Sequence, residues 1–282
     1  MELKKRVRMV ALDIDGTIVA GRGDHDGLPS EAVRAAVAEL SAAGVAVVLA
    51  SGRMFPGTRK VGAYLGLSTP VICQQGCSVH RQSGEMTHQF AIDLSLASEV
   101  VAHGREIDRH VEWFNPLRYL VSGRNRASDD YALVSGITPE YTPFPEHSGV
   151  IPTGVGIISD HDEATLIHRE LVHRYGDRLH LLDFPTVTVA VHPDANKGHA
   201  LSLVCEDLGI ARGQVVAIGD SVNDAAMLAW AGRGVAMPHS DRYALDAADE
   251  VLPGDDPDSV AHFLRSLLPH GQRVPGRQRL SL

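Results

Sequence analysis

The strongest constraint on the fold is an alternation of apolar, strand-like runs with amphipathic, helix-like segments. It occurs in two separate stretches of the chain. In the first, strand-like runs at 8–14, 45–50 and 70–73 flank helical patterns at 29–43 and 59–65. In the second, helical patterns lie at 197–208, 224–231 and 258–268, and strand-like runs at 214–218, 234–237 and 251–252. Near-continuous apolar strands that alternate with helices indicate a parallel sheet covered by helices on both faces.

The segment between these stretches has a different pattern. Residues 78–90 resemble a hairpin around 82–84, and helical patterns at 95–108 and 161–175 lie among short strand-like pieces. Between them, residues 122–149 read as irregular, with one weak helical pattern at 130–134. Antiparallel strands with helices on one face fit this pattern better than a second doubly wound half. We therefore predict an α/β fold. A Rossmann-like doubly wound core (1–77 and 192–268) would carry an inserted α+β cap domain (78–191), followed by a mobile tail (269–282).

Composition excludes several classes of protein. Apolar residues make up 44% and charged residues 22% of the 282 residues, which is typical of a globular chain. No apolar run reaches the roughly 18 residues that a membrane span needs, and the N-terminal segment lacks signal-peptide features. The net charge of −9 argues against nucleic acid as a main partner. Three sparse cysteines indicate buried thiols in a reducing, cytoplasmic setting rather than a disulfide framework.

The loop after the first strand carries two carboxylates, Asp13 and Asp15, followed by Gly16 and Thr17. Carboxylates one residue apart at a strand end both enter the loop, where Gly16 permits a sharp turn. One carboxylate can attack phosphorus, and the other can protonate the leaving oxygen and later deprotonate water. An Asp-Gly turn or a helix cap is the ordinary alternative for such a pair.

Three further polar signals lie at predicted strand ends or helix starts. Ser51, Gly52 and Arg53 follow the second strand and offer a hydroxyl and backbone N–H groups to a phosphate, although alone they read as a helix cap. Lys197 opens a helix, where its ammonium opposes the helix dipole unless an anion lies nearby.

The last of these signals is the run Gly219-Asp220-Ser221-Val222-Asn223-Asp224, which follows a strand. Its carboxylates suit a hard cation such as Mg²⁺, which prefers oxygen ligands. Each of these signals alone has an ordinary reading as a turn, a cap or a solvated side chain. Together, at the strand ends where open parallel sheets bind ligands, they predict one site.

This set of motifs resembles the haloacid-dehalogenase-like (HAD) superfamily, in particular its Cof-type phosphatases with a type IIB cap. DIDGT, LASGR, NKG and GDSVND occur in the family's order, and the resemblance covers about residues 7–268. The two segments around 75 and 239 depart from the family pattern, with Gln74-Gln75-Gly76 where Asn-Gly is common and Pro238-His239-Ser240 where Gly-Asn-Ala is usual.

The resemblance implies roles for the matching residues. Asp13 would be the nucleophile and a Mg²⁺ ligand, and Asp15 the general acid/base, with its backbone carbonyl also on the metal. Ser51 and Lys197 would grip phosphoryl oxygens, Thr17 would hold the nucleophile loop, and Asn223 would lie near the phosphate. Asp220 would be the main remaining metal ligand, supported by Asp224.

The resemblance also implies a function: a Mg²⁺-dependent phosphatase for small phosphorylated metabolites, such as sugar phosphates, that acts through an aspartyl phosphate. Phosphomutase or phosphotransferase activity on the same site, or a non-catalytic phosphometabolite-binding regulator, remains an alternative. The cap would read the leaving group, and its candidate contacts are Glu112, Trp113, Tyr119, Arg124 and Arg126. Trp113 and Tyr119 have an equally good reading as cap core, and the two arginines as solvated loop residues.

Overall fold

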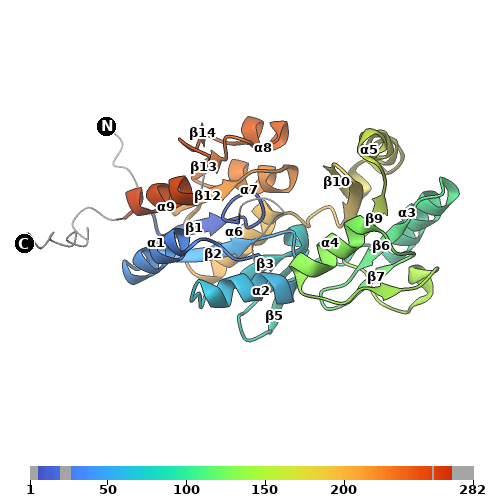
Figure 1. Cartoon of the computed structure of the whole chain (residues 1–282), viewed down its shortest axis with the longest axis horizontal. Coiled ribbons are helices and arrows are strands. Elements are labelled where there is room, and N and C mark those ends of the chain that lie inside the picture. Colours follow the sequence, from blue (N-terminus) through green and yellow to red (C-terminus); the bar gives the residue numbers. More distant parts are fainter. Residues whose placement is uncertain (1–5, 20–26, 256, 269–282) are drawn as a thin grey trace, which may run out of the picture.

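The structure is a computed structural model that describes residues 6–19, 27–255 and 257–268. Within these residues the chain forms one sheet of eight strands and one of six, each covered by helices. The two sheets lie side by side along the long axis of the molecule (Figure 1). The expected α/β class is confirmed. The expected tail, 269–282, lies outside the described residues.

The first sheet has the strand order β14-β13-β12-β1-β2-β3-β4-β5. The strands from β14 to β3 are parallel, whereas β4 and β5 join antiparallel. Their bounds are β1 Met9–Leu12, β2 Ala46–Ala50, β3 Val71–Cys73, β4 Ser78–His80, β5 Met86–Gln89, β12 Val215–Gly219, β13 Arg233–Ala236 and β14 Glu250–Val251.

Helices cover both faces of this sheet, as the alternating pattern predicts. They are α1 Glu31–Ala42, α2 Phe55–Tyr64, α6 Lys197–Asp207, α7 Ala225–Trp230, α8 Arg242–Ala247 and α9 Pro257–Ser266. Val10 and Leu12 of β1 pack with α1, α2 and α9, whereas Met9 and Ala11 pack with α6, α7 and α8. Successive strand residues point to opposite faces, so β1 is buried on both sides.

The start of α2 differs from the expectation, because the helix begins at Phe55 and not near residue 59. Pro56 stands in its first turn, where a helix makes no use of the missing N–H. The proline therefore lies inside the helix and does not precede it.

The second sheet has the strand order β10-β11-β9-β6-β7-β8 and is antiparallel except for the β7–β8 pair. Its strands are β6 Val111–Phe114, β7 Tyr119–Val121, β8 Glu140–Tyr141, β9 Gly154–Ile158, β10 His180–Phe184 and β11 Val187–Val191. Two helices, α3 Leu94–Glu106 and α5 His161–Tyr175, pack on one face. Helix α4, Arg126–Ser135, packs on the other and lies between this sheet and α2 (Figure 1).

Helix α4 is longer than the weak helix expected around 130–134. The side chain of Asn125 accepts a hydrogen bond from the backbone N–H of Ser128, and Gly136 ends the helix in the left-handed conformation. These are an ordinary N-cap and C-cap. The helix therefore has defined ends within a stretch that reads as irregular.

The hairpin of β4 and β5 does not belong to the second sheet. Val71 of β3 pairs with His80 of β4, so the hairpin extends the edge of the first sheet. Val79 is buried with the residues under that sheet. The predicted insert from residue 78 includes this hairpin, which pairs with the first sheet, because sequence shows that the two strands pair with each other but not which sheet edge they join.

Candidate functional site

The register of three central strands brings the predicted site residues to one edge of the first sheet. Leu12 of β1 pairs with Leu49 of β2 and with Ile218 of β12. Asp13 follows the first of these strands directly, Ser51 comes two residues after Leu49, and Asp220 two after Ile218. The loops after these strands must therefore lie side by side.

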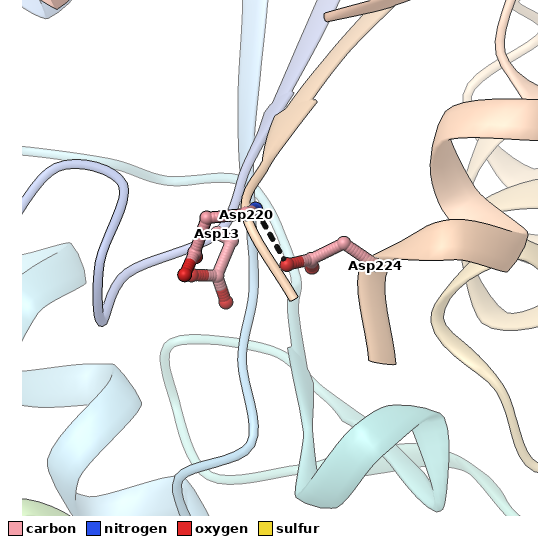
Figure 2. A group of neighbouring side chains, drawn as sticks. All are labelled: Asp13, Asp220 and Asp224. Atoms are coloured by element: carbon pink, nitrogen blue, oxygen red, sulfur yellow. Dashed lines mark hydrogen bonds between the residues drawn. The ribbon is translucent and has the colours of Figure 1, made fainter. Parts of the chain in front are cut away.

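A cluster of three carboxylates lies at this edge. One oxygen each of Asp13, Asp220 and Asp224 lies within 4.8 Å of the others. Asp13 and Asp220 extend from neighbouring strand ends, and the Asp224 side chain points toward them from the start of α7 (Figure 2). Oxygen donors at this spacing suit a hard divalent cation.

Gly16 and Thr17 shape the approach of Asp220. Gly16 has φ +90°, and a Cβ there would lie 2.4 Å from the Asp220 Oδ2 atom. The Thr17 hydroxyl donates to Asp220 Oδ1 at 3.1 Å. The turn after the first strand therefore needs glycine both for its backbone conformation and for space.

Lys197 bridges Asp13, in the loop after β1, and Asp224, at the start of α7. Its side chain is fully buried, and its Nζ donates to Asp13 Oδ1 at 2.6 Å and to Asp224 Oδ1 at 2.7 Å. It is the first residue of α6, where a cation opposes the helix dipole. The two carboxylates supply the anion that this placement requires.

Both oxygens of Asp224 have partners. Oδ1 accepts from Lys197, and Oδ2 accepts from the backbone N–H groups of Asp220 and Ser221 at 3.0 Å each. Figure 2 shows the bond to the Asp220 backbone. Asp224 thus fixes the loop that carries Asp220.

Burial and neighbouring charges perturb the pKa of Asp13, Asp220 and Lys197. Burial and the nearby charge of Asp224 raise the pKa of Asp13, although the Lys197 ammonium opposes the shift. The same two causes raise the pKa of Asp220 to about 6. Burial lowers the pKa of Lys197, but attraction to Asp13 and Asp224 outweighs it, so that the pKa is raised. The cluster carries excess negative charge that a bound cation would compensate.

Asp15 turns to a different partner. Arg53 Nε and Nη2 donate to Asp15 Oδ2 and Oδ1 at 2.7 and 2.6 Å, and Arg53 Nη1 donates to the Gly27 carbonyl at 3.2 Å. Sequence reasoning assigned Arg53 to a phosphate seat. In the structure its guanidinium pairs with the second carboxylate of the first loop.

Ser51, Gly52 and Asn223 line the same edge. The buried Ser51 Oγ accepts from the backbone N–H of Arg53 at 3.1 Å, and the Gly52 carbonyl accepts from the Tyr131 hydroxyl of α4 at 3.2 Å. Asn223 Nδ2 donates to Gln75 Oε1. Helix α4 of the second sheet therefore contacts the loop that follows β2.

Two residues that sequence reasoning left without a role also reach the site. Gln75 contacts Asn223, and His239 Nε2 donates to the Gly16 carbonyl at 2.8 Å while Nδ1 pairs with Asp255. Burial lowers the pKa of His239, but its hydrogen bonds to Asp255 and Gly16 outweigh this and raise it. Their only signal in the sequence is that both stand where the chain departs from the family pattern.

The candidate cap residues fall into different environments. Trp113 is fully buried in the layer under α3 and α5, where its Nε1 donates to the Val150 carbonyl, so it is a core residue. Tyr119 is also fully buried, and its hydroxyl donates to the buried Glu112. The guanidinium carbon of Arg124 lies 4.6 Å from the centre of the Tyr141 ring. The Arg126 side chain is 95% exposed.

Cys73, Cys77 and Cys205 are all buried free thiols, as expected. Among the described residues, no helix combines the length and the apolar character needed to cross a membrane.

A family profile described as haloacid dehalogenase-like hydrolase matches residues 10–264. HMP-PP phosphatase of Cronobacter sakazakii is 29% identical over 268 residues, which cover 93% of this chain and 96% of that protein. A haloacid dehalogenase-like hydrolase from B. subtilis superposes with a TM-score of 0.80 at 22% identity, covering 93% of this chain and all of the other. A sugar phosphatase of HAD subclass IIB superposes with a TM-score of 0.78 at 17% identity, covering 92% and 98%.

Proposed function

The chain belongs to the haloacid dehalogenase-like hydrolase family, and from this premise we propose that it is a Mg²⁺-dependent phosphatase that uses Asp13 as a nucleophile. Its substrates would be small phosphorylated metabolites, sugar phosphates or similar compounds, in the cytoplasm. The curated relative is named a phosphatase and one structural relative a sugar phosphatase, which supports this class.

One observation carries the proposal: Lys197 is buried between Asp13 and Asp224, with Asp220 in the same cluster. A buried ammonium paired with two buried carboxylates is costly to assemble for stability alone, because desolvation offsets much of the attraction. Strongly perturbed groups gathered at the carboxyl ends of parallel strands favour a functional site.

In the proposed reaction, an Asp13 oxygen attacks the substrate phosphorus and the bond from phosphorus to the leaving oxygen breaks. Asp15 donates its proton to that oxygen, so the alcohol leaves neutral. Asp15 then takes a proton from water as the water attacks the aspartyl phosphate. Inorganic phosphate leaves, and both carboxyls return to their starting states.

The donor set fits a divalent cation. Asp13 and Asp220 would hold it with side-chain oxygens, and the backbone carbonyl of Asp15 would complete the protein's share. Asp224, predicted as a further ligand, would support the site through Lys197 and the Asp220 loop, since both its oxygens already accept hydrogen bonds. When bound, Mg²⁺ neutralises charge on phosphoryl oxygens.

The remaining predicted residues would bind and orient. Ser51, the backbone of Gly52, and Asn223 would hold phosphoryl oxygens, as would Lys197. Thr17 would fix Asp220 through its hydroxyl. Arg53 would orient Asp15 instead of binding phosphate. Positioning and electrostatic stabilisation account for most of the catalysis of phosphoryl transfer, and every one of these contacts serves one of the two.

The six-stranded sheet would act as the cap that excludes water and reads the leaving group. Helix α4, which packs on this sheet, supplies Tyr131, whose hydroxyl donates to the Gly52 carbonyl, and Ser135, whose Oγ accepts from the backbone N–H of Met54 at 3.1 Å. These contacts seat α4 on the loop that would bind phosphate. In this proposal residues 91–191 form the cap, and the β4–β5 hairpin stays with the core.

The test compares the unmodified protein with Asp13→Asn for Mg²⁺-dependent release of phosphate from an aryl phosphate. We expect the variant to lose at least about a thousandfold in kcat, because the nucleophile is gone. Activity near the unmodified level would refute the covalent mechanism. A panel of phosphorylated metabolites, read for free phosphate and for isomerised product, then separates hydrolysis from phosphomutase activity.

A further inference from the structure

The segment after β3 holds an unusual backbone. Gln74 has φ +49° and Gln75 has φ +63°, in the short 3₁₀ turn Gln74–Gly76. Two consecutive residues with side chains in the left-handed region are uncommon and cost free energy. Such strain persists where surrounding contacts impose it, and it is concentrated at functional sites.

The two glutamine side chains diverge. Gln74 is buried: its Nε2 donates to the Asn115 carbonyl at 3.2 Å, and its Oε1 accepts from Thr153 at 3.3 Å, both in the second sheet's half of the molecule. Gln75 instead turns to the first sheet, where its Oε1 accepts from Asn223 Nδ2.

Gln75 also lies directly on the loop that follows β2. Its backbone N–H donates to the Ser51 carbonyl at 3.2 Å, and a Cβ on Gly52 would lie 2.6 Å from Gln75 Nε2. A side chain at position 52 would therefore displace this carboxamide. One side chain therefore spans the distance between the loop after β2 and the loop after β12.

We propose that Gln75 is a positioning residue of this site, whose carboxamide fixes the Asn223 amide beside the Ser51–Gly52 loop, at the spacing needed to bind a phosphoryl group. This rests on the proposed phosphatase function. The hydrogen bond from Asn223 Nδ2 to Gln75 Oε1 orients the Asn223 amide. The buried Oδ1 of that amide has no hydrogen-bond partner among the described residues. Turning both carboxamides over keeps their mutual bond and presents an Asn223 N–H, the donor that a phosphoryl oxygen needs.

Two substitutions separate the side-chain bridge from the backbone strain. Gln75→Ala removes the carboxamide. Gln75→Asn keeps a carboxamide but shortens the side chain by one methylene, and asparagine tolerates a positive φ better than glutamine. If the bridge matters, both variants lose function, although Gln75→Asn keeps its thermal stability.

Gln82 supplies a matched control. Its Nε2 donates to the Thr69 carbonyl at 3.2 Å, and a Cβ on Gly62 would lie 2.7 Å from that nitrogen. It is thus a second glutamine whose carboxamide packs on a glycine and bonds to another segment, but in the turn between β4 and β5. Gln82→Ala and Gln82→Asn should leave phosphate binding and turnover unchanged.

The readouts are kcat/KM for an aryl phosphate and the inhibition constant of inorganic phosphate. We expect both Gln75 variants to lower kcat/KM about tenfold and to raise the inhibition constant about fivefold, in line with loss of one or two hydrogen bonds. The double variant Gln75→Ala/Asn223→Ala should lose no more than Asn223→Ala alone, because the bridge needs both partners.

Additive losses in the double variant, or a Gln75→Asn protein that binds phosphate like the unmodified one, would overturn the inference. Calorimetric titration of the protein with inorganic phosphate in the presence of Mg²⁺ distinguishes failure of the positioning role from failure of the proposed function. If the unmodified protein binds phosphate without turning over substrate, and the Gln75 variants bind it more weakly, the positioning role stands and hydrolysis falls. If Asp13→Asn is inactive while the Gln75 variants behave as unmodified, only the positioning role falls.

Discussion

Arg53 and Asp15 form a bidentate ion pair, in which Nε and Nη2 of the guanidinium donate to the two carboxylate oxygens at 2.7 and 2.6 Å. The Arg53 side chain is only 3% exposed, whereas that of Asp15 is 48% exposed. A buried, planar guanidinium that binds both oxygens fixes the plane of the carboxylate as well as its position. In the proposed reaction this orients the general acid/base toward the leaving oxygen.

Arg53→Lys should lower kcat/KM about tenfold, because lysine keeps the charge but cannot hold both oxygens. Steady-state kinetics with an aryl phosphate measures this. Arg34→Lys is the control, since Arg34 makes the same bidentate pair with Glu31 on the exposed face of α1 and should leave kinetics unchanged. Equal kinetics for both variants would exclude an orienting role for Arg53.

Lys197→Met should destabilise the protein by about 3–5 kcal/mol at pH 7.5, because it leaves Asp13 and Asp224 buried without their cation. Urea unfolding measures the free energy. The double variant Lys197→Met/Asp13→Asn should recover part of the loss, since one buried charge is removed. A single variant as stable as the unmodified protein would contradict this account.

Mg²⁺ should stabilise the protein more at pH 7.5 than at pH 5. The pKa of Asp220 is raised to about 6, so below that pH its carboxyl is protonated and a poorer ligand. One coupled proton weakens affinity about tenfold per pH unit below the pKa, which corresponds to about 1.4 kcal/mol of stabilisation. Thermal unfolding with and without Mg²⁺ tests this.

Asp220→Asn should reduce the pH dependence of the Mg²⁺ effect and leave Asp13 as the remaining ligand with a raised pKa. It removes the titrating oxygen and leaves an amide in its place. A Mg²⁺-induced shift in Tm that is the same at both pH values in the unmodified protein would argue against Asp220 as a ligand.

Glu112→Gln should change stability in a pH-dependent way. Burial raises the pKa of Glu112 from 4.5 to about 7, against the opposing hydrogen bond from Tyr119. A carboxyl with a raised pKa in the folded state favours folding at low pH, and this benefit is lost as pH rises from 4.5 through 7. The variant should therefore exceed the unmodified protein by up to about 3 kcal/mol at pH 8.5, and by less than about 1 kcal/mol at pH 5.

Urea unfolding at the two pH values measures this difference. Glu140→Gln is the control, because Glu140 pairs with Arg118 at the surface and should change stability by less than about 1 kcal/mol at either pH. A pH-independent effect of Glu112→Gln would mean that the pKa of Glu112 is the same in the folded and unfolded states.

The fold and the meeting of Asp13, Ser51 and Asp220 could be predicted because parallel strands end at a common edge. Lys197 was predictable for a second reason: a cation at a helix start needs a nearby anion. Both arguments depend only on local pattern and on the topology that the pattern indicates.

Other features depend on contacts that no local pattern encodes. The bridge from Gln75 joins Asn223, 148 residues away in sequence, and arises from two left-handed residues that the sequence does not announce. Arg53 was assigned to phosphate because its neighbours resemble a phosphate seat, but only coordinates show that Asp15 lies within reach. The sequence predicted that β4 and β5 form a hairpin, but not which sheet the hairpin joins.

The chain leaves the first sheet near Phe90 and returns near His192, and the rings of these two residues lie 6.2 Å apart. Both connections thus pass through one narrow point, with His199 of α6 5.1 Å from the same phenyl ring. In the proposed division of the chain, the cap of residues 91–191 enters and leaves at this one point, whereas Asp13, Asp220 and Asp224 all lie outside it. Under the proposed function, selectivity and chemistry could therefore diverge independently, one by replacement of the cap and the other by point substitution.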